Sequence, residues 1–172
     1  IFHSSHADSS LHMASPAPLT LRDVRVGTIA PTIERGKENE ATFHWPLGMA
    51  LTPQGDLLVA NYLGHNIRLI DSKGTVTTYA GTGQQGFQNG HKESATFSGP
   101  SSIVLTPQGD LLVTDVLNNC LRKVAKDGSV SIFAGTGQQG FKNGPKEQAT
   151  FFYPFGLIRT NQGALLVLDK GN

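Results

Sequence analysis

The chain repeats itself with a period of 54 residues, and this period constrains the fold more than any other feature. Residues 41–94 and 95–148 align without a gap and are identical at 29 positions. A third copy starts with the same Ala-Thr-Phe sequence at Ala149 and runs to Asn172. A repeat of this length indicates one supersecondary unit per copy, which buries its apolar surface against the neighbouring copies.

The same register divides the rest of the chain. Upstream, Gly27 falls at the position of Gly81, so residues 21–40 are interpreted as the diverged end of a preceding unit. Residues 1–20 do not fit the repeat, and their five serines, three histidines and two prolines predict a flexible segment. We therefore expect a short arm at 1–20 and one repeat domain over 21–172, with units at 41–94, 95–148 and 149–172.

Each complete unit carries four short β signals and no sustained helical period. A Pro-Gln-Gly turn at residues 53–55 predicts a hairpin between the first two strands, with Gly55 at a position of positive φ. Four antiparallel strands per repeat are typical of a β-propeller blade. In the first unit the predicted strands are Gly48–Thr52, Asp56–Asn61, Ile67–Ile70 and Thr75–Ala80.

The second strand of each unit is apolar on both faces, as in Leu58 and Val59. A propeller blade needs this, because neighbouring blades cover its middle strands from both sides. We predict an all-β fold: an incomplete propeller with about two and a half four-stranded blades. Propellers close with four to eight blades, so we expect a fragment of a larger propeller or closure by self-assembly. The expected equivalents of Leu58 and Val59 are Leu112, Val113, Leu166 and Val167.

The order Ala-Thr-Phe, Leu-Leu-Val, Ala-Gly-x-Gly and Asn-Gly in these units resembles the NHL-repeat family. The resemblance covers residues 21–172 and implies a six-bladed, TolB-like propeller. The copies depart from one another at Asn61, where the other two have Asp115 and Asp169, and at Asn161, which replaces the proline of the hairpin turn.

A glycine-rich motif, GxGxxG, occurs at residues 81–86 and again at 135–140. In a dinucleotide site its third glycine opens a helix whose N-terminus holds the pyrophosphate. Here an Asn-Gly pair follows within four residues in both copies, which breaks a helix. The motif therefore predicts a connection between blades and no dinucleotide site.

Composition narrows the function classes. A net charge of +1 and a pI near 8.1 give no general attraction to nucleic acid or anionic membrane. The single cysteine, Cys120, excludes an internal disulfide and a Cys-x-x-Cys metal site, and we expect a half-buried small residue there. No apolar run is long enough to span a bilayer. No Asn-x-Ser/Thr sequon is present, and its absence favours a cytoplasmic location.

Candidate contact residues lie where the copies differ, because shared positions are needed to build the blade. The blade connection and the loop between the second and third strands open on the same face, around the channel of a propeller. Aromatic residues with polar tips are good contact residues. Alternatively, Trp45 and Tyr153 precede a proline and cover the blade junction. The candidates are His44, Trp45, Tyr62, His65, Tyr153 and Lys170.

Asn61, Asp115 and Asp169 follow the Leu-Leu-Val segments or their equivalents. Their recurrence predicts hydrogen bonds to the backbone of their own loops, with channel metal or base chemistry as the alternative. Arg68 and Arg122 recur too, and we expect them to pair with this residue or with a neighbouring blade.

The leading hypothesis is a binding module that recognises a protein or peptide, with no catalytic residue, metal ligand or cofactor assigned. One alternative is a metal-dependent propeller enzyme resembling gluconolactonases or lyases, although His44 and His65 form a weak metal signal. The other is RNA binding, which needs a basic face with stacking aromatics. The lysines here alternate with acidic residues: Lys92, Lys123, Lys126, Lys142 and Lys146 lie near Glu93, Asp127 and Glu147.

Overall fold

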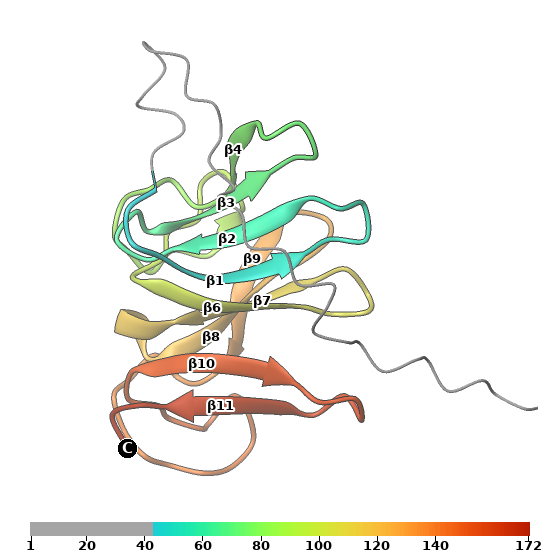
Figure 1. Cartoon of the computed structure of the whole chain (residues 1–172). Helices are drawn as coiled ribbons and strands as arrows, with labels where there is room; N and C mark the ends of the chain where they lie inside the picture. The colour runs from blue at the N-terminus through green and yellow to red at the C-terminus, as the bar shows by residue number, and fades with distance from the viewer. Residues whose placement is uncertain (1–42) are drawn as a thin grey trace, which may run out of the picture.

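The computed structural model describes residues 43–172 as three antiparallel sheets that lie side by side (Figure 1). The predictions for residues 1–20 and 21–40 lie outside the described residues. Between residues 43 and 172 the helical content is one short 3₁₀ turn, Val116–Asn118, and no helix there is long and apolar enough to cross a bilayer.

The first sheet is a four-stranded blade with the strands in chain order. Gly55 turns the chain at φ 91°, and its N–H donates to the Thr52 carbonyl at 3.0 Å, as the Pro-Gln-Gly signal predicts. Each strand lies within two residues of its predicted boundaries. The strands are β1 (Pro46–Leu51), β2 (Leu57–Asn61), β3 (Asn66–Ile70) and β4 (Val76–Ala80).

The second sheet repeats this blade and adds a fifth strand at its outer edge. The extra strand comes from the connection that leaves the first blade, and it pairs with the outer strand of the second. The first blade is thereby fastened to the second along the outer rim. The strands are β5 (Gly90–His91), β6 (Pro100–Leu105), β7 (Leu111–Asp115), β8 (Cys120–Val124) and β9 (Ser129–Ala134).

The third sheet contains β10 (Pro154–Arg159) and β11 (Leu165–Asp169), the equivalents of the two inner strands of a blade. The described residues therefore form two complete blades and half of a third, which confirms the predicted all-β, incomplete propeller.

Two apolar clusters join neighbouring blades. The first lies between blades one and two and contains Leu58, Phe97 and Val113; the second lies between blades two and three and contains Leu112 and Leu157. Leu58, Val59, Leu112 and Val113 are all buried, so the middle strands are covered on both faces as predicted. Leu166 of blade three is 54% exposed, because no sheet among the described residues covers that face.

The innermost strands approach each other differently at the two junctions. At the first junction a Cβ added to Gly48 would lie 2.4 Å from the Ser101 carbonyl oxygen, so the two backbones pack directly together. At the second, the Ser102 hydroxyl bridges to β10: it donates to the Leu157 carbonyl at 3.2 Å and accepts from the Leu157 N–H at 3.1 Å. The difference between Gly48 and Ser102 in the two copies thus has a direct packing reason.

Candidate functional site

An Asn or Asp side chain at the end of each second strand organises one face of the blades. Each of these side chains accepts a backbone N–H from the segment that enters the inner strand, 17 residues earlier. The predicted role in backbone hydrogen bonding is confirmed, but the partner is this earlier segment and not the residue's own loop. The three bonds run from His44 N to Asn61 Oδ1 (2.6 Å), from Ser98 N to Asp115 Oδ1 (2.6 Å) and from Phe152 N to Asp169 Oδ1 (2.8 Å).

The loop after each second strand lies against the same entering segment. In the first blade, Tyr62 N–H donates to the Trp45 carbonyl at 3.1 Å and Leu63 N–H donates to the His44 carbonyl at 3.0 Å. The equivalent pairs of hydrogen bonds recur in the second and third blades. The two loops therefore share one face, and the candidate residues sit on a rigid, hydrogen-bonded platform.

Two aromatic residues on this platform adopt a backbone conformation that favours glycine. Trp45 has φ 56° and Tyr153 has φ 55°, and the equivalent residue of the second blade is Gly99, with φ 68°. The left-handed region costs an ordinary L-residue about 1–2 kcal/mol relative to glycine. Both aromatic side chains are exposed, Trp45 by 65% and Tyr153 by 41%. Their rings therefore recover only part of that cost through burial.

Aromatic side chains from two blades converge on a hollow of about 290 Å³ on this face. The ring centres of Tyr62 and Phe155 are 6.4 Å apart, and the Lys170 ammonium lies 5.2 Å from the centre of the Phe155 ring. The hollow is thus apolar with a cation beside it. It is lined by Tyr62, Val116, Leu117, Tyr153, Phe155, Lys170 and Gly171.

Three of the six candidates, Tyr62, Tyr153 and Lys170, therefore line one hollow, whereas His44, Trp45 and His65 do not. The His65 ring forms a link between blades: its Nδ1 accepts the N–H of Gly99 at 3.2 Å. Burial lowers the pKa of His65, which is consistent with a neutral, accepting ring.

The sequence analysis missed four residues that line the hollow: Val116, Leu117, Phe155 and Gly171. Phe155 occupies the position of Leu47 and Ser101, so the comparison between copies that selected Tyr153 could have selected it too. Leu117 gave no such signal, because the first copy has Leu63 at the same position and a shared residue was interpreted as structural.

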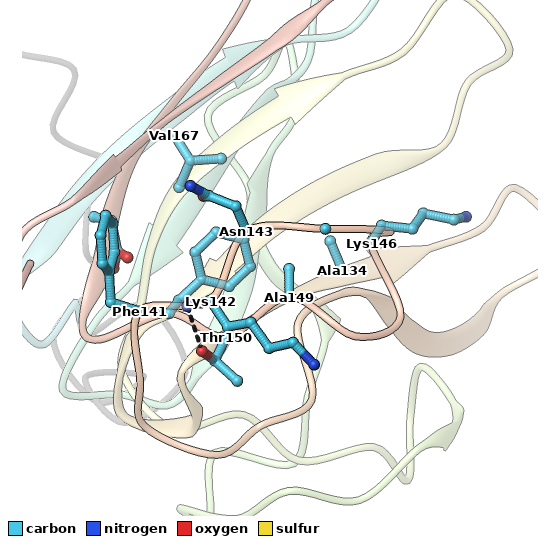
Figure 2. Close-up of a pocket in the computed structure, with 11 residues that line it drawn as sticks. Ala134, Phe141, Lys142, Asn143, Lys146, Ala149, Thr150 and Val167 are labelled. Atoms are coloured by element: carbon cyan, nitrogen blue, oxygen red, sulfur yellow. Dashed lines mark hydrogen bonds between the residues drawn. The ribbon is translucent and has the colours of Figure 1, made fainter.

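A second cavity, of about 430 Å³, lies beside β11 (Figure 2). It is bounded by the connection that leaves the second blade and by the side chains of Val167 and Asp169. The connection contributes Phe141, Lys142, Asn143, Gly144, Lys146, Ala149, Thr150 and Phe151, and Ala134 of β9 completes the wall.

Two buried ionisable residues, Cys120 and Asp115, have raised pKa values. Cys120 is fully buried, more than the half-buried residue expected, and burial together with the nearby Asp115 charge raises its pKa to about 12, so its thiol is no nucleophile at neutral pH. Burial raises the pKa of Asp115 to about 6, against hydrogen bonds from Asn118 and Ser98 and the Arg122 charge. Within residues 43–172, no three His, Cys, Asp or Glu side chains are grouped so as to hold a metal ion.

In the second blade the recurring arginine pairs with Asp115 and with the blade connection, as expected. Arg122 Nη1 donates to Asp115 Oδ2 at 2.9 Å and to the Thr96 carbonyl of the blade connection at 3.1 Å. In the first blade, Arg68 Nη1 donates to the Thr78 hydroxyl at 2.8 Å, within its own sheet.

Comparison with known proteins supports the fold and leaves the family open. No family model matches the chain. Protein SUPPRESSOR OF QUENCHING 1, chloroplastic, of Arabidopsis thaliana is 31% identical over 86 residues, which cover 49% of this chain and 8% of that protein. The chain therefore spans less than a tenth of the length of this curated relative.

Solved structures resemble the chain over most of its length, and they are propeller-like proteins. A Bacteroides thetaiotaomicron protein of unknown function has a TM-score of 0.62 and 25% identity, over 66% of this chain and 29% of that one. An auxiliary nutrient binding protein of the same species has a TM-score of 0.61 and 23% identity, over 71% and 34%. A gluconolactonase of Xanthomonas campestris has a TM-score of 0.55 and 17% identity, over 76% and 36%. This chain spans about a third of each.

Proposed function

We propose that this chain contributes NHL-type blades to a propeller that binds a protein or peptide through its loop face. The observation that carries the proposal is the hollow formed by Tyr62, Tyr153 and Phe155, with Lys170 beside it. Exposed aromatic side chains on a preorganised backbone bind with little loss of conformational entropy.

The backbone of this face supports the same function. Trp45 and Tyr153 are held at positive φ where the middle copy has Gly99, so an aromatic side chain is present at a cost in folding stability. Local strain of this kind clusters at ligand-binding sites. The scaffold itself does not need these rings, because the second blade is complete without one.

The hollow also defines the class of partner. Its apolar wall fits an aliphatic or aromatic side chain, and the Lys170 ammonium favours a carboxylate next to that side chain. We expect an extended segment that presents an apolar residue beside an Asp or Glu. The enzyme and RNA-binding alternatives stay predictions that no specific feature of the described residues favours.

Selection of displayed random peptides on the chain, followed by calorimetric titration of the selected sequences, tests this function. Tyr153→Gly restores the residue type of Gly99, and Lys170→Ala removes the cation. Each is expected to weaken binding about 5- to 30-fold, the range for residues that anchor an interface. Phe141→Ala is the control, because Phe141 is an exposed aromatic residue outside the hollow.

If the selected peptides bind Tyr153→Gly and Lys170→Ala as tightly as the wild type, the hollow is not the binding site and the proposal fails. Loss of binding in Phe141→Ala alone would move the site to the cavity beside β11.

A further inference from the structure

The imidazole of His65 links the loop after β2 to the segment that enters the second blade. Its Nδ1 accepts the backbone N–H of Gly99 at 3.2 Å, and the two residues are 34 positions apart in the sequence. The His65 side chain is half-buried. An imidazole nitrogen accepts a hydrogen bond only while it carries no proton of its own. This link between blades therefore exists only when His65 is neutral.

The next junction has the same link with a different acceptor. Asn119 is the equivalent of His65, and its Oδ1 accepts the Tyr153 N–H at 3.1 Å. The two acceptors also share a left-handed backbone, with φ 51° for His65 and φ 49° for Asn119. An amide side chain gains no proton between pH 5 and 8, whereas an imidazole does. Of these two equivalent links, only the one between the first and second blades titrates.

The hollow on the loop face has walls from three blades. Among the described residues that line it, Tyr62 comes from the first blade, Val116 and Leu117 come from the second, and the others come from the third. Gly99 lies against the first two walls, because a Cβ added to it would be 2.9 Å from Tyr62 Cε2 and 3.3 Å from Leu117 Cγ. The Tyr62 ring therefore packs on the residue whose N–H is bound by His65.

The backbone hydrogen bonds that hold these two segments lie within their own blades. Tyr62 N–H donates to the Trp45 carbonyl at 3.1 Å in the first blade. Val116 N–H donates to the Gly99 carbonyl at 3.3 Å in the second. Among the hydrogen bonds of residues 43–172, the one from Gly99 to His65 alone joins the loop after β2 to the segment that enters the second blade. Its loss therefore frees the Tyr62 wall to move relative to the other two.

The charged groups around His65 do not replace this link. Burial lowers the pKa of His65, and within the part of the chain that the structure describes no carboxylate forms an ion pair with its ring. Asp115, which accepts the Ser98 N–H beside Gly99, is already paired with Arg122. The titratable and charged groups on the surrounding elements are His44, Tyr62, Lys92, Asp115, Arg122 and Lys170.

The direction of the pH effect follows from the surroundings of the ring. While the link is intact, burial and the bond from Gly99 hold the pKa of His65 below its usual range. In the released loop the ring is in water, where its pKa is about 6.5. A lowered pKa favours the linked state fully above about pH 6.5, and this contribution is lost as the pH falls through the lowered pKa. Acid therefore favours release of the loop.

We propose that His65 is a pH-sensitive positioning residue: its neutral ring holds the Tyr62 wall of the hollow in place, and protonation of Nδ1 by solvent releases that wall. The consequence for binding rests on the function proposed above, whereas the link and its release are properties of the chain alone. A partner that needs the complete hollow binds more weakly in acid. By linkage, its binding also lowers the pKa of His65 further.

Nuclear magnetic resonance of the full chain without any partner tests the release. The signals are the backbone amide of Gly99 and, in chain labelled with 3-fluorotyrosine, the ring of Tyr62. We expect both signals to shift with one midpoint, below about pH 6.5 and equal to that of the His65 ring. The amide of Tyr153, which Asn119 binds, should not follow this midpoint.

His65→Asn is the matched variant, because Asn119 performs the same role at nearly the same φ. It keeps an acceptor for the Gly99 N–H but has no titrating ring, so both shifts should disappear. Burial raises the pKa of Asp115 to about 6, and any shift that remains in His65→Asn belongs to this carboxyl and its bond from Ser98. Circular dichroism checks the fold of the variant.

The consequence for binding is measured with the selected peptides whose affinity Tyr153→Gly reduces, by calorimetric titration at pH 7.5 and pH 5.5. The wild type should bind them about 3- to 10-fold more weakly at pH 5.5, because the released ring is protonated about ten to one at one unit below its pKa. His65→Asn should bind equally at both pH values. His65→Gly fits the left-handed backbone but removes the acceptor, and it should bind weakly at both.

A Gly99 amide shift that is the same in the wild type and in His65→Asn would overturn the proposal, and so would a Tyr62 signal that stays constant while His65 titrates. Wild-type affinity in His65→Gly at pH 7.5 would show that the link positions nothing. If no selected peptide depends on Tyr153, the function proposed for the hollow fails instead. The resonances of Gly99 and Tyr62 then still decide whether His65 positions the wall.

Discussion

Arg122 and Asp115 form an ion pair in which Nη1 lies 2.9 Å from Oδ2 and both side chains are completely buried. The two residues lie on the neighbouring strands β7 and β8, diagonally across the ladder, and Arg122 reaches on to the connection that joins the first blade to the second. Removing two charges from water is costly, and only a complete set of hydrogen bonds offsets that cost. Asp115 also accepts from Asn118 and Ser98.

Replacing Arg122 with methionine should therefore destabilise the chain strongly. Arg122→Met fills a similar volume but leaves Asp115 as a buried carboxylate without its cation. Removal of one partner of a buried pair costs about 3–5 kcal/mol in the free energy of unfolding at neutral pH. Urea unfolding followed by circular dichroism measures it. Lys123→Met on the same strand is the control, because its ion pair with Asp110 is at the surface and worth little. Equal midpoints for the two variants would contradict this.

The destabilisation by Arg122→Met should also depend on pH. Burial already raises the pKa of Asp115 to about 6, compared with about 3.9 for an unfolded aspartate, and loss of the Arg122 charge raises it further. A carboxyl with a raised pKa favours the folded state fully below its unfolded pKa, and this contribution is lost as pH rises through the folded pKa. Between about pH 4 and pH 6 both proteins should lose stability at the same rate, because Asp115 is protonated in both folded states and ionised in both unfolded states. Above about pH 6 the loss should level off in the wild type and continue in the variant.

Urea midpoints at several pH values between 4.5 and 7.5 test this, and the difference between wild type and variant should grow as pH increases above about 6. His65 is present in both proteins, so its titration cancels in the difference. A constant difference would show that Asp115 does not sense the Arg122 charge.

The repeat predicted most of the fold because its signals are local. The turn at Gly55 and the alternation of apolar residues lie within a few residues of the strands they define, and all four strands of the blade were found. Strand β5 was missed because Gly90 and His91 become a strand only by pairing with Val130 and Ser129, about 40 residues away.

Only part of the candidate site could be predicted from the sequence. Comparing copies identified Tyr62, Tyr153 and Lys170, and the structure brings them to one hollow. The sequence could not show that His65 accepts the N–H of Gly99, a bond between residues 34 positions apart. The sequence also could not predict the cavity beside β11, because a cavity is formed by side chains from several segments.

Close packing of the inner strands gives a prediction for Gly48. Gly48→Ala would place a Cβ 2.4 Å from the Ser101 carbonyl oxygen, a backbone atom that cannot move alone, so β1 and β6 must separate. We expect a loss of about 1–3 kcal/mol in unfolding free energy, typical of overpacking. Thermal unfolding measures it. Ser102→Ala offers the comparison at the other junction, where about 1 kcal/mol should be lost with the hydroxyl's bonds to Leu157. An unchanged melting temperature for Gly48→Ala would contradict the direct backbone packing.

The left-handed positions give the last prediction. Trp45→Gly relieves an unfavourable φ and removes a ring that is 65% exposed. Glycine, however, adds entropy to the unfolded chain. Because these effects offset each other, we expect the free energy of unfolding to change by no more than about 0.5 kcal/mol. Gly99→Ala does the opposite at the equivalent position. It adds a Cβ at φ 68° that would lie 2.9 Å from the Tyr62 ring, so about 1–2 kcal/mol should be lost. Chemical unfolding of both variants tests whether Gly99→Ala destabilises the chain more than Trp45→Gly. A large loss for Trp45→Gly would mean that the indole ring builds the blade junction, and its role as a binding residue would then have no support from stability.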